Sequence, residues 1–345
     1  MIEKLQNFLC FLRNHRVSLL KNAKVFAVVI FLLLGIFVLA EFYSAVLLSY
    51  RIIIDRNIDV KFPSKEFFKE LRKNIDYSSF TTFDENYFYE EDDSLMGHEA
   101  KYRKPVGLNY DKSPIIFFGC SCTFGLGVEK DKTLPAKISE YSHRPVYNFA
   151  ISGWGVQHVL WLLNNEKKLD EIKNPEYAIY VFIDDHYRRA MSAFPYAEVP
   201  MSLLLYTEKN GQFIKENPYK NILYRSYFFR LLSEKVGFWK SQMPVFKEYR
   251  EKKVVSFIRE ENRILKQKYP NIKFVVFSIT VDCDETSFEK KIEKAGITVI
   301  DGKKIFEEKT DGEPYKPTKW EFPDGHPNDK MYSLFAHELV KKMNL

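Results

Sequence analysis

The sequence predicts an α/β protein whose core is a doubly wound parallel sheet, preceded by a single transmembrane helix. Two observations predict the sheet: five short apolar runs are spaced along the chain from residue 115 onward, and stretches with helical apolar periodicity lie between them. A third observation predicts the transmembrane helix, because a long uncharged apolar run lies close to the N-terminus.

The composition is that of a folded chain. Of 345 residues, 46% are hydrophobic and 28% are charged, which is enough apolar material to bury a large core. The formal net charge is +6, and residues 1–24 contribute +4 of it, from five Lys and Arg against one Glu. The other residues carry only +2, so nucleic acid is not indicated as a partner. Four Cys exclude a disulfide scaffold, and no Cys or His spacing indicates a metal site.

A transmembrane helix is predicted over residues 25–44. Residues 25–40 carry no charge, and the apolar run continues past Glu41. About 20 residues at 1.5 Å rise per residue cross the hydrocarbon core of a bilayer. Because the basic residues precede this span, residues 1–24 are predicted to be cytoplasmic and the rest of the chain to be exported. Glu41 then lies near a membrane interface.

Two alternatives exist for this segment. Val38-Leu39-Ala40 resembles the cleavage site of a signal peptide, which would export the same domain. A buried core helix is the third interpretation. Because residues 1–24 are long for a signal peptide, we predict an uncleaved single-pass anchor in the cytoplasmic (inner) membrane, with the following domain periplasmic or extracellular.

The exported part divides into a lead-in and one sheet-forming domain. Residues 45–112 lack regular alternation and are interpreted as a stalk and lead-in, and residues 113–345 as the domain. An insertion or lid over one sheet edge is predicted at about residues 190–251. The predicted strands are 115–118, 146–149, 178–183, 274–279 and 298–300. The predicted helices are 134–141, 156–165, 253–268 and 330–343.

A glycine-rich turn follows the first predicted strand and contains Ser121, between Gly119 and Gly125. In open α/β sheets, ligands bind beyond the carboxyl ends of the strands, where helix N-termini present N–H groups. Ser121 is therefore a candidate nucleophile. The alternatives are an ordinary strand-to-helix turn and a phosphate-binding loop, although neither a Walker spacing nor a complete G-x-G-x-x-G is present.

A second polar group, Asp324 and His326, lies between Pro323 and Pro327 near the C-terminus. An imidazole can remove the proton of a hydroxyl nucleophile when a carboxylate orients the ring. Asp324 and His326 could supply that orienting group and that base. The alternative is a surface turn, since Pro-Asp-Gly is also common turn chemistry.

Two further polar blocks follow the second and third predicted strands, at residues 147–155 and 182–188. Together with the blocks around Ser121 and His326, these blocks follow one another in the same order as in the SGNH (GDSL-like) hydrolase family. The chain resembles this family, and in particular its exported, membrane-anchored bacterial members, over about residues 115–345. The resemblance implies a flavodoxin-like α/β/α fold with a five-stranded sheet. It also implies an esterase or acyl-transfer site that needs no metal or organic cofactor.

The resemblance assigns roles to individual residues. Ser121 matches the nucleophile, with its own N–H in the oxyanion hole, and Gly153 matches the glycine that donates a second N–H. Asp324 and His326 match the catalytic base block, with the Asp two residues before the His where three is usual. Asp184 stands where the family has an oxyanion-stabilising Asn, and an ionised carboxylate there would repel an oxyanion.

Other departures leave alternatives open. Cys120 takes the place of the Asp in Gly-Asp-Ser. Asn148 could replace Asp184 as an oxyanion donor, and Cys122 could act as a thiol nucleophile. Arg188 and Arg189 could bind an anionic sugar or lie on a solvated face.

The sequence thus predicts a membrane-anchored extracytoplasmic serine esterase or acyltransferase that acts on O-acyl groups of a glycan or lipid. Its expected partners are the lipid bilayer, an acylated substrate and, for a transferase, a membrane acyl donor. The alternative is a catalytically inactive glycan-binding or assembly-scaffold protein with the same fold.

Overall fold

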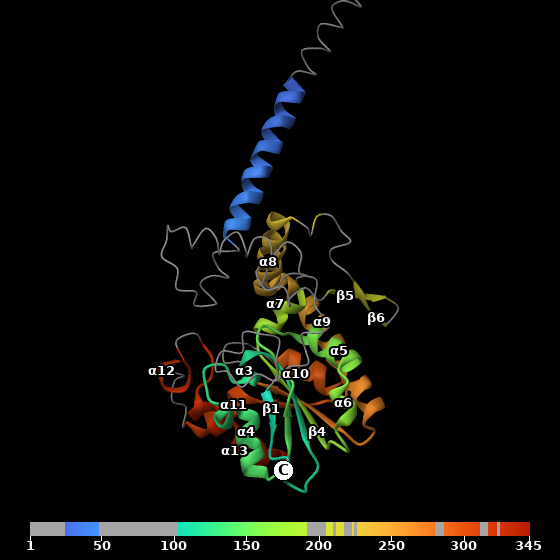
Figure 1. Cartoon of the computed structure of the whole chain (residues 1–345), viewed down its shortest axis with the longest axis vertical. Helices are drawn as coiled ribbons and strands as arrows, with labels where there is room; N and C mark the ends of the chain where they lie inside the picture. Colours follow the sequence, from blue (N-terminus) through green and yellow to red (C-terminus); the bar gives the residue numbers. More distant parts are fainter. Residues whose placement is uncertain are drawn as a thin grey trace, which may run out of the picture.

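The computed structural model describes residues 25–47, 103–191, 205–209, 212–216, 223, 226–279, 286–310, 317–322 and 325–345. Its body is a sheet with helices on both faces, and a long N-terminal helix projects away from that body (Figure 1). The predicted α/β class is confirmed by this arrangement.

The central sheet has six strands in the order β1-β3-β2-β4-β7-β8. Five of them are parallel, and the chain runs from β2 to β3 on one side before it crosses to β4 on the other. This reversal places a topological switch point at the carboxyl end of β2, where ligands bind in sheets of this kind. The strands are β1 (Arg103–Val106), β2 (Ile115–Phe118), β3 (Val146–Asn148), β4 (Tyr177–Phe182), β7 (Lys273–Ser278) and β8 (Thr298–Asp301).

The predicted five-stranded parallel sheet needs one correction. A sixth strand, β1, pairs antiparallel with β3 at the edge of the sheet, so the sheet is mixed. This strand lies before residue 113, inside the segment expected to be a lead-in. Its sequence is Arg-Lys-Pro-Val, which has no apolar run to predict a strand. Pro105 is tolerated because an edge strand need not donate every backbone hydrogen bond.

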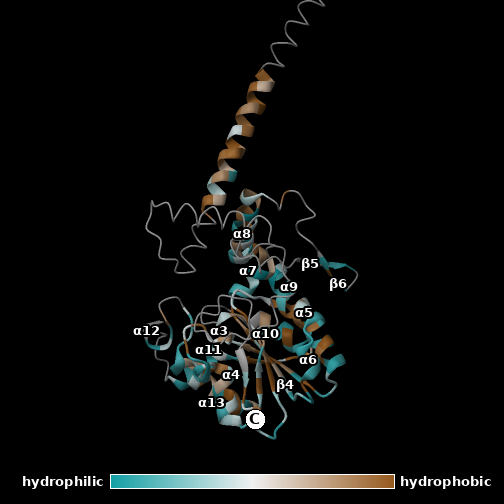
Figure 2. Ribbon diagram, in the orientation of Figure 1, coloured by the Kyte–Doolittle hydropathy of each residue, from teal (hydrophilic) through white to brown (hydrophobic). Residues whose placement is uncertain are grey.

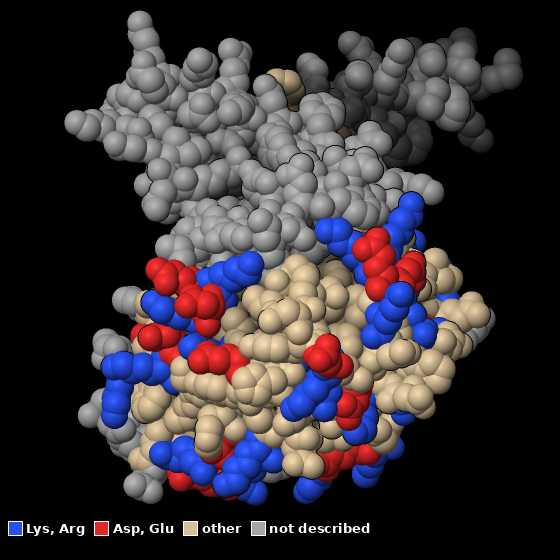
Figure 3. Space-filling view, turned by 60° about the horizontal axis from the view of Figure 1, so that its bottom comes forward, with Lys and Arg blue, Asp and Glu red and all other residues tan. Residues whose placement is uncertain are grey.

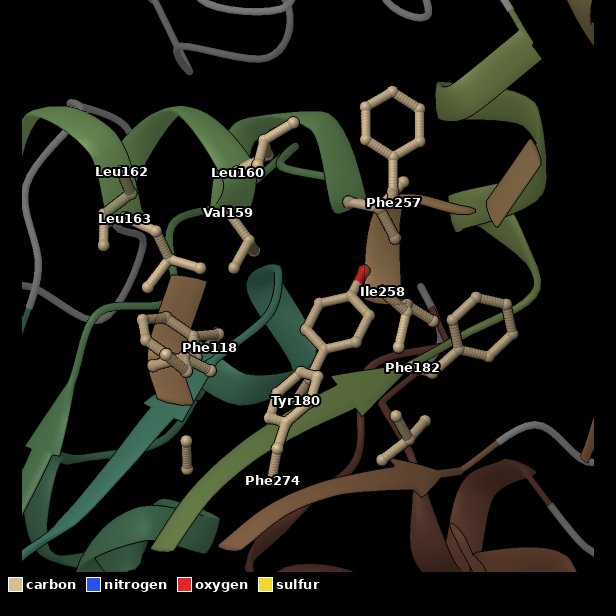
Figure 4. Close-up of a cluster of buried hydrophobic side chains, with 14 of the residues drawn as sticks. Phe118, Val159, Leu160, Leu162, Leu163, Tyr180, Phe182, Phe257, Ile258 and Phe274 are labelled. Atoms are coloured by element: carbon tan, nitrogen blue, oxygen red, sulfur yellow. The ribbon is translucent and has the colours of Figure 1, made fainter. Parts of the chain in front are cut away.

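Alternate strand residues enter two hydrophobic clusters, one on each face of the sheet. Phe118, Tyr180 and Phe182 belong to the cluster that packs under α5 (Val156–Asn165) and α9 (Lys247–Lys268), as Figure 4 shows. Their neighbours along the strands enter the other cluster, and burial on both faces explains the continuous apolar runs. Each fully buried Phe contributes roughly 1.5–3 kcal/mol to folding.

The opposite face of the sheet is covered by α4 (Leu134–Ser142), α11 (Gly302–Lys309) and α13 (Asp329–Met343). Side chains cap these helices at the points where they begin. Thr133 accepts a hydrogen bond from Ala136 N at 3.3 Å, and Asn328 accepts from Lys330 N at 3.1 Å. Caps of this kind contribute about 0.5–2 kcal/mol each. The remaining helices of the domain are α3 (Ser121–Phe124), α6 (Lys168–Glu171), α7 (Asp185–Met191), α10 (Thr286–Glu293) and α12 (Pro317–Trp320).

The predicted insertion at residues 190–251 contains a β-hairpin and a long helix in its described part. The hairpin joins β5 (Leu205–Lys209) to β6 (Gln212–Glu216). The helix α8 (Tyr227–Gln242) packs against α7. A one-turn 3₁₀ helix (Pro244–Phe246) then leads directly into α9, so the helix predicted at 253–268 begins six residues earlier.

The N-terminal helix (Val25–Leu47) is long and apolar enough to cross a membrane, with 23 residues, a mean hydropathy of 2.9 and 0% of its most apolar window buried. Figure 2 shows its hydrophobic colouring along most of its length. Its last turns contact α8. The ring of Phe37 lies 6.3 Å from that of Phe228 and 6.4 Å from that of Phe229.

Glu41 forms a polar contact at the same junction. Its carboxylate accepts hydrogen bonds from Tyr227 N at 2.6 Å, Ser226 Oγ at 2.6 Å and Phe228 N at 3.0 Å. The first N–H groups of a helix have no partner within the helix, so Glu41 satisfies two of them in α8. A negative charge there also interacts favourably with the helix dipole.

Positive and negative side chains are interspersed over the face shown in Figure 3. At the amino ends of the strands, Glu176 pairs with Arg144 at 2.7 Å and with Lys273 at 3.0 Å. Such exposed pairs contribute about 0–1 kcal/mol each, so they contribute little to the stability of the sheet.

Candidate active site

The candidate nucleophile stands on a tight turn at the carboxyl end of β2. Gly119 has φ +154°, and a Cβ there would lie 2.1 Å from Thr123 Oγ1. Cys120 is the extended N-cap residue of α3, and Ser121 is the first residue of that four-residue helix. The predicted strand-to-helix turn is therefore present. Ser121 is only 7% exposed, so its hydroxyl faces a confined space.

Side chains from two other elements support this short helix. Tyr332 of α13 donates its hydroxyl proton to the carbonyl of Cys122 at 2.8 Å. Asn148 of β3 donates its amide N–H to the carbonyl of Thr123 at 3.0 Å. Since the last carbonyls of a helix lack partners within it, these bonds satisfy groups that α3 cannot pair itself. They also fix the position of Ser121.

His326 lies in a closed loop between α12 and α13. A β-bridge joins Glu321 to Pro327, and Phe322 N donates to the carbonyl of His326 at 2.8 Å. Gly325 turns the chain with φ +85°, a conformation that favours glycine. The loop approaches the nucleophile turn closely, because a Cβ on Gly127 would lie 3.0 Å from the ring of Phe322.

The structure brings the predicted nucleophile and the predicted base together. His326 Nε2 lies 2.8 Å from Ser121 Oγ. This is the separation of an O–H···N hydrogen bond and is within proton-transfer reach. When the ring carries its proton on Nδ1, the hydroxyl of Ser121 donates to Nε2, and Nε2 can accept the proton as Oγ attacks an electrophile.

Asp324 lies outside the described residues, so its role as the group that orients His326 stays a prediction. Phe322 and Gly325 are the nearest described residues on either side of it. Phe322 and Gly325 are joined by a backbone hydrogen bond of 2.9 Å from Gly325 N to the Phe322 carbonyl.

The two predicted oxyanion amides lie on neighbouring loops. Ser121 is the first residue of α3, where helix N–H groups have no partner within the helix. Gly153 has φ +80° in the turn that follows β3, closed by a bond of 3.2 Å from Trp154 N to the Ile151 carbonyl. Ile151 N in turn donates to the carbonyl of Gly119 at 3.4 Å, which joins the two loops.

Asp184 lies beyond the end of β4, separated from it by Ile183, and directly precedes α7. Its carbonyl accepts from Tyr187 N at 2.9 Å in the first turn of that helix. Its predicted place beside the oxyanion stays a prediction. Asn148 donates one amide N–H to the Thr123 carbonyl and its oxygen accepts from Ala150 N at 3.1 Å, while its considered role as an oxyanion donor stays a prediction. Both contacts stabilise the loops around the site.

The two cysteines beside Ser121 are buried and differ in acidity. Hydrogen bonding from Cys122 and the positive charges of His186 and Arg189 hold the pKa of Cys120 well below its usual value, although burial alone would raise it. The hydrogen bond to Cys120, followed by burial, raises the pKa of Cys122 well above its usual value. Cys122 as an alternative thiol nucleophile stays a prediction.

Arg189 is a residue whose role sequence analysis missed. It was expected on a solvated or sugar-binding face, but its side chain is 4% exposed and pairs with Asp185 at 2.7 Å. Arg188 pairs with the same carboxylate at 2.6 Å. The Asp-x-x-Arg-Arg spacing places both cations one helical turn from Asp185, and this was the signal available in the sequence.

Among the residues that the structure describes, no three His, Cys, Asp or Glu side chains group in a way that could hold a metal ion. The described polar groups around Ser121 are suited to proton transfer and to hydrogen bonding of an anion.

No family model matches the chain, and no curated protein matches it. Several solved structures are similar. An acetyl xylan esterase from the rumen bacterium Butyrivibrio proteoclasticus shares 12% identity over 68% of this chain and 65% of its own, with a TM-score of 0.39. The chain thus spans less than two thirds of the length of that esterase.

Two other similar structures are described as lipolytic. One is a G-D-S-L family protein from Veillonella parvula, with 11% identity, coverage of 68% of this chain and 99% of that one, and a TM-score of 0.37. The other is a putative GDSL-like lipase from Parabacteroides merdae, with 12% identity, coverage of 67% and 95%, and a TM-score of 0.38.

Proposed function

We propose that the chain is a membrane-anchored serine esterase that acts outside the cytoplasmic membrane on O-acyl groups of a glycan. The observation that carries this proposal is the 2.8 Å contact between Ser121 Oγ and His326 Nε2 at the switch point of the sheet. A serine hydroxyl on a strand-to-helix turn, with an imidazole in proton-transfer reach, is the arrangement that nucleophilic acyl transfer requires.

The proposed reaction begins when Ser121 Oγ attacks the ester carbonyl and its proton passes to His326 Nε2. The tetrahedral oxyanion accepts hydrogen bonds from the amides of Ser121 and Gly153. The ester's alcohol then leaves with the proton from His326, and the acyl group remains on Ser121. Water, activated by His326, attacks this acyl-serine and releases the free acid. Asp324 orients the imidazole and stabilises its charged form.

Acyl transfer differs from this reaction only in the last step. A sugar hydroxyl, in place of water, would attack the acyl-serine and accept the acyl group. In that case a membrane acyl donor would be the source of the acyl group on Ser121. Both variants use the same residues of this chain. A glycan is the substrate class that the resemblance in the sequence and the predicted export of the domain together favour. A lipid ester is the second substrate class predicted from the sequence.

The membrane anchor is supported by the N-terminal helix and its contacts. This helix has the length and hydropathy of a span, and Phe37 and Glu41 both contact α8 of the exported domain. Cleavage after Ala40 would remove Phe37 from that junction. We therefore favour a retained, single-pass anchor in the cytoplasmic membrane, with residues 1–24 inside and the esterase domain periplasmic or extracellular.

The function is tested with the full chain, purified in detergent, on p-nitrophenyl acetate. We expect turnover that falls by several orders of magnitude in Ser121→Ala. Ser142→Ala serves as the control, since Ser142 donates to Ile138 within α4, away from the site, and should leave turnover unchanged. Equal rates in the wild type and Ser121→Ala would reject the esterase and favour a non-catalytic glycan-binding protein.

A further inference from the structure

A buried arginine holds the loop that carries the second proposed oxyanion donor. Arg189 Nη1 donates to the carbonyl of Trp154, the residue directly after Gly153. Arg189 is 4% exposed and Trp154 is 1% exposed, so this contact is shielded from water. A hydrogen bond from a charged group in a buried place is stronger than one at the surface.

The position of the guanidinium is fixed by a second contact. Arg189 Nε and Nη2 donate to Asp185 Oδ2 at 2.8 Å and 2.7 Å. Asp185 is the first residue of α7 and Arg189 lies one turn later, so the helix itself sets the spacing of this pair. The guanidinium binds Asp185 through Nε and Nη2 and the Trp154 carbonyl through Nη1, and a lysine, whose donors all lie on one nitrogen, does not reproduce this fork.

The start of α5, which follows this loop directly, also contacts α7. Gln157 Nε2 donates to the carbonyl of Arg189 at 2.9 Å. A Cβ on Gly155 would lie 2.9 Å from Arg189 Cβ, so only glycine allows this approach. Gly155 N is further bonded to His158 Nδ1 at 3.1 Å. The loop from Gly153 to Gly155 therefore lies directly against α7, and Arg189 makes a charged contact to the Trp154 carbonyl within it.

The charge of Arg189 also reaches the nucleophile turn. It is one of the groups that hold the pKa of Cys120 low, against the effect of burial. Because Asp184 replaces the usual amide donor, the backbone amides of Ser121 and Gly153 carry the oxyanion stabilisation that we propose. Donors of this kind must lie about 2.7–3.1 Å from the oxyanion, so the placement of Gly153 matters for the rate.

We propose that Arg189 is a positioning residue for the oxyanion hole, which it serves by fixing the Gly153 amide through the Trp154 carbonyl. This inference rests on the proposed esterase function. Displacement of a catalytic group by about 1 Å can lower a rate roughly 10²-fold, so we expect a loss of kcat of this size when Arg189 is replaced.

The test compares an ester with its thionoester in the full chain in detergent: p-nitrophenyl acetate and O-p-nitrophenyl thionoacetate. Sulfur accepts hydrogen bonds poorly, so an oxyanion hole favours the ester over the thionoester. We expect Arg189→Met to lower kcat for the ester roughly 10²-fold while KM changes little. The thionoester rate should fall less, so the ester-to-thionoester ratio should drop at least about tenfold.

Arg188→Met is the matched control, because Arg188 lies beside Arg189 and donates to the same Asp185 through Nε at 2.6 Å and Nη2 at 2.9 Å. It should leave the ester-to-thionoester ratio unchanged. Arg189→Lys keeps the charge without the fork and should give an intermediate ratio. If Arg189→Met does not fold, as judged by circular dichroism, the ester-to-thionoester ratio of Arg189→Lys tests the inference instead.

The outcomes separate the two proposals. If the wild type turns over the ester through Ser121 but both rates fall equally in the folded Arg189 variants, Arg189 has only a structural role and the inference is overturned. A ratio that falls equally in Arg188→Met would overturn it as well. If wild-type turnover does not depend on Ser121, the esterase proposal fails and this inference fails with it.

Discussion

His326 Nε2 and Ser121 Oγ lie 2.8 Å apart although 205 positions separate them in the sequence. Two loops create this contact. One follows β2 at the switch point of the sheet, and the other, which precedes α13, reaches the first where the Phe322 ring packs on Gly127. The candidate catalytic pair is therefore a product of the whole sheet topology rather than of a local motif.

Asp324 is predicted to orient His326. Replacement by Asn should preserve the fold and lower kcat for p-nitrophenyl acetate by roughly 10⁴-fold, because the imidazole loses the carboxylate that fixes its tautomer and stabilises its charged form. Asp329→Asn is the control, since Asp329 lies in the exposed first turn of α13, outside the proposed machinery. A kcat in Asp324→Asn equal to that of the wild type would exclude this role.

Gly119 is predicted to be essential for the geometry of the nucleophile. In Gly119→Ala, the new Cβ would meet Thr123 Oγ1 at 2.1 Å and force α3 to move, so kcat should fall roughly 10²-fold. Gly296→Ala is the matched control, because Gly296 also has a positive φ of +72° but nothing within 4 Å of its Cβ position. It should reduce the free energy of unfolding by about 1–2 kcal/mol and leave kcat unchanged. Equal kcat losses in both variants would contradict the prediction.

Glu261 gives the protein a predicted dependence of stability on pH. It is 0% exposed within α9, neither carboxylate oxygen has a hydrogen-bond partner among the described residues, and burial raises its pKa well above the usual value. The folded state therefore keeps a proton that the unfolded state has lost above a pH of about 4.3. The stability of the wild type should fall as the pH rises from that value toward the raised pKa.

Glu261→Gln removes this dependence. The variant should unfold at a higher temperature than the wild type at pH 7 and at nearly the same temperature at pH 4. A gain of about 1 kcal/mol in the free energy of unfolding corresponds to a shift of roughly 2–4 °C in a domain of this size. Glu260→Gln is the control, because Glu260 forms a surface pair with Arg263 at 2.6 Å. If the difference in unfolding temperature between Glu261→Gln and the wild type does not change with pH, the prediction is refuted.

Glu41 is predicted to attach the N-terminal helix to the sheet domain through α8. In Glu41→Ala, the N-terminus of α8 loses its carboxylate acceptor, which should reduce local stability by about 0.5–2 kcal/mol. Hydrogen exchange of residues 226–242, measured on the full chain in lipid nanodiscs, should become faster. Tyr43→Ala, an exposed position on the same helix, should leave exchange unchanged. Unchanged exchange in Glu41→Ala would contradict this attachment, and a purified chain that begins at Glu41 would contradict the retained anchor.

The elements that the sequence predicted well were those with local signals. The strand at 115–118 and the helix at 156–165 have the predicted bounds, because apolar runs and helical periodicity depend on neighbouring residues. Ser121 and His326 could be found because Gly and Pro mark their loops. Their contact could not be derived from spacing, since only the order of the strands brings the two loops together.

Other features depend on tertiary packing and left no local signal. The strand at 103–106 has two basic residues and a proline, so it is recognisable only through its pairing with β3. Arg189 looks like a surface residue in sequence, and its burial follows from the approach of the Trp154 carbonyl to α7. The capping of α8 by Glu41 joins residues 186 positions apart and is equally invisible in the sequence.

The most direct test of the central claim is covalent labelling of the full chain with a fluorophosphonate probe, followed by mass spectrometry of the modified peptide. We predict that the probe modifies Ser121 Oγ in the wild type and that labelling is slower by at least about 10²-fold in His326→Ala, since the hydroxyl then lacks its base. Modification of another side chain, or a folded protein whose Ser121 stays unlabelled, would contradict the account.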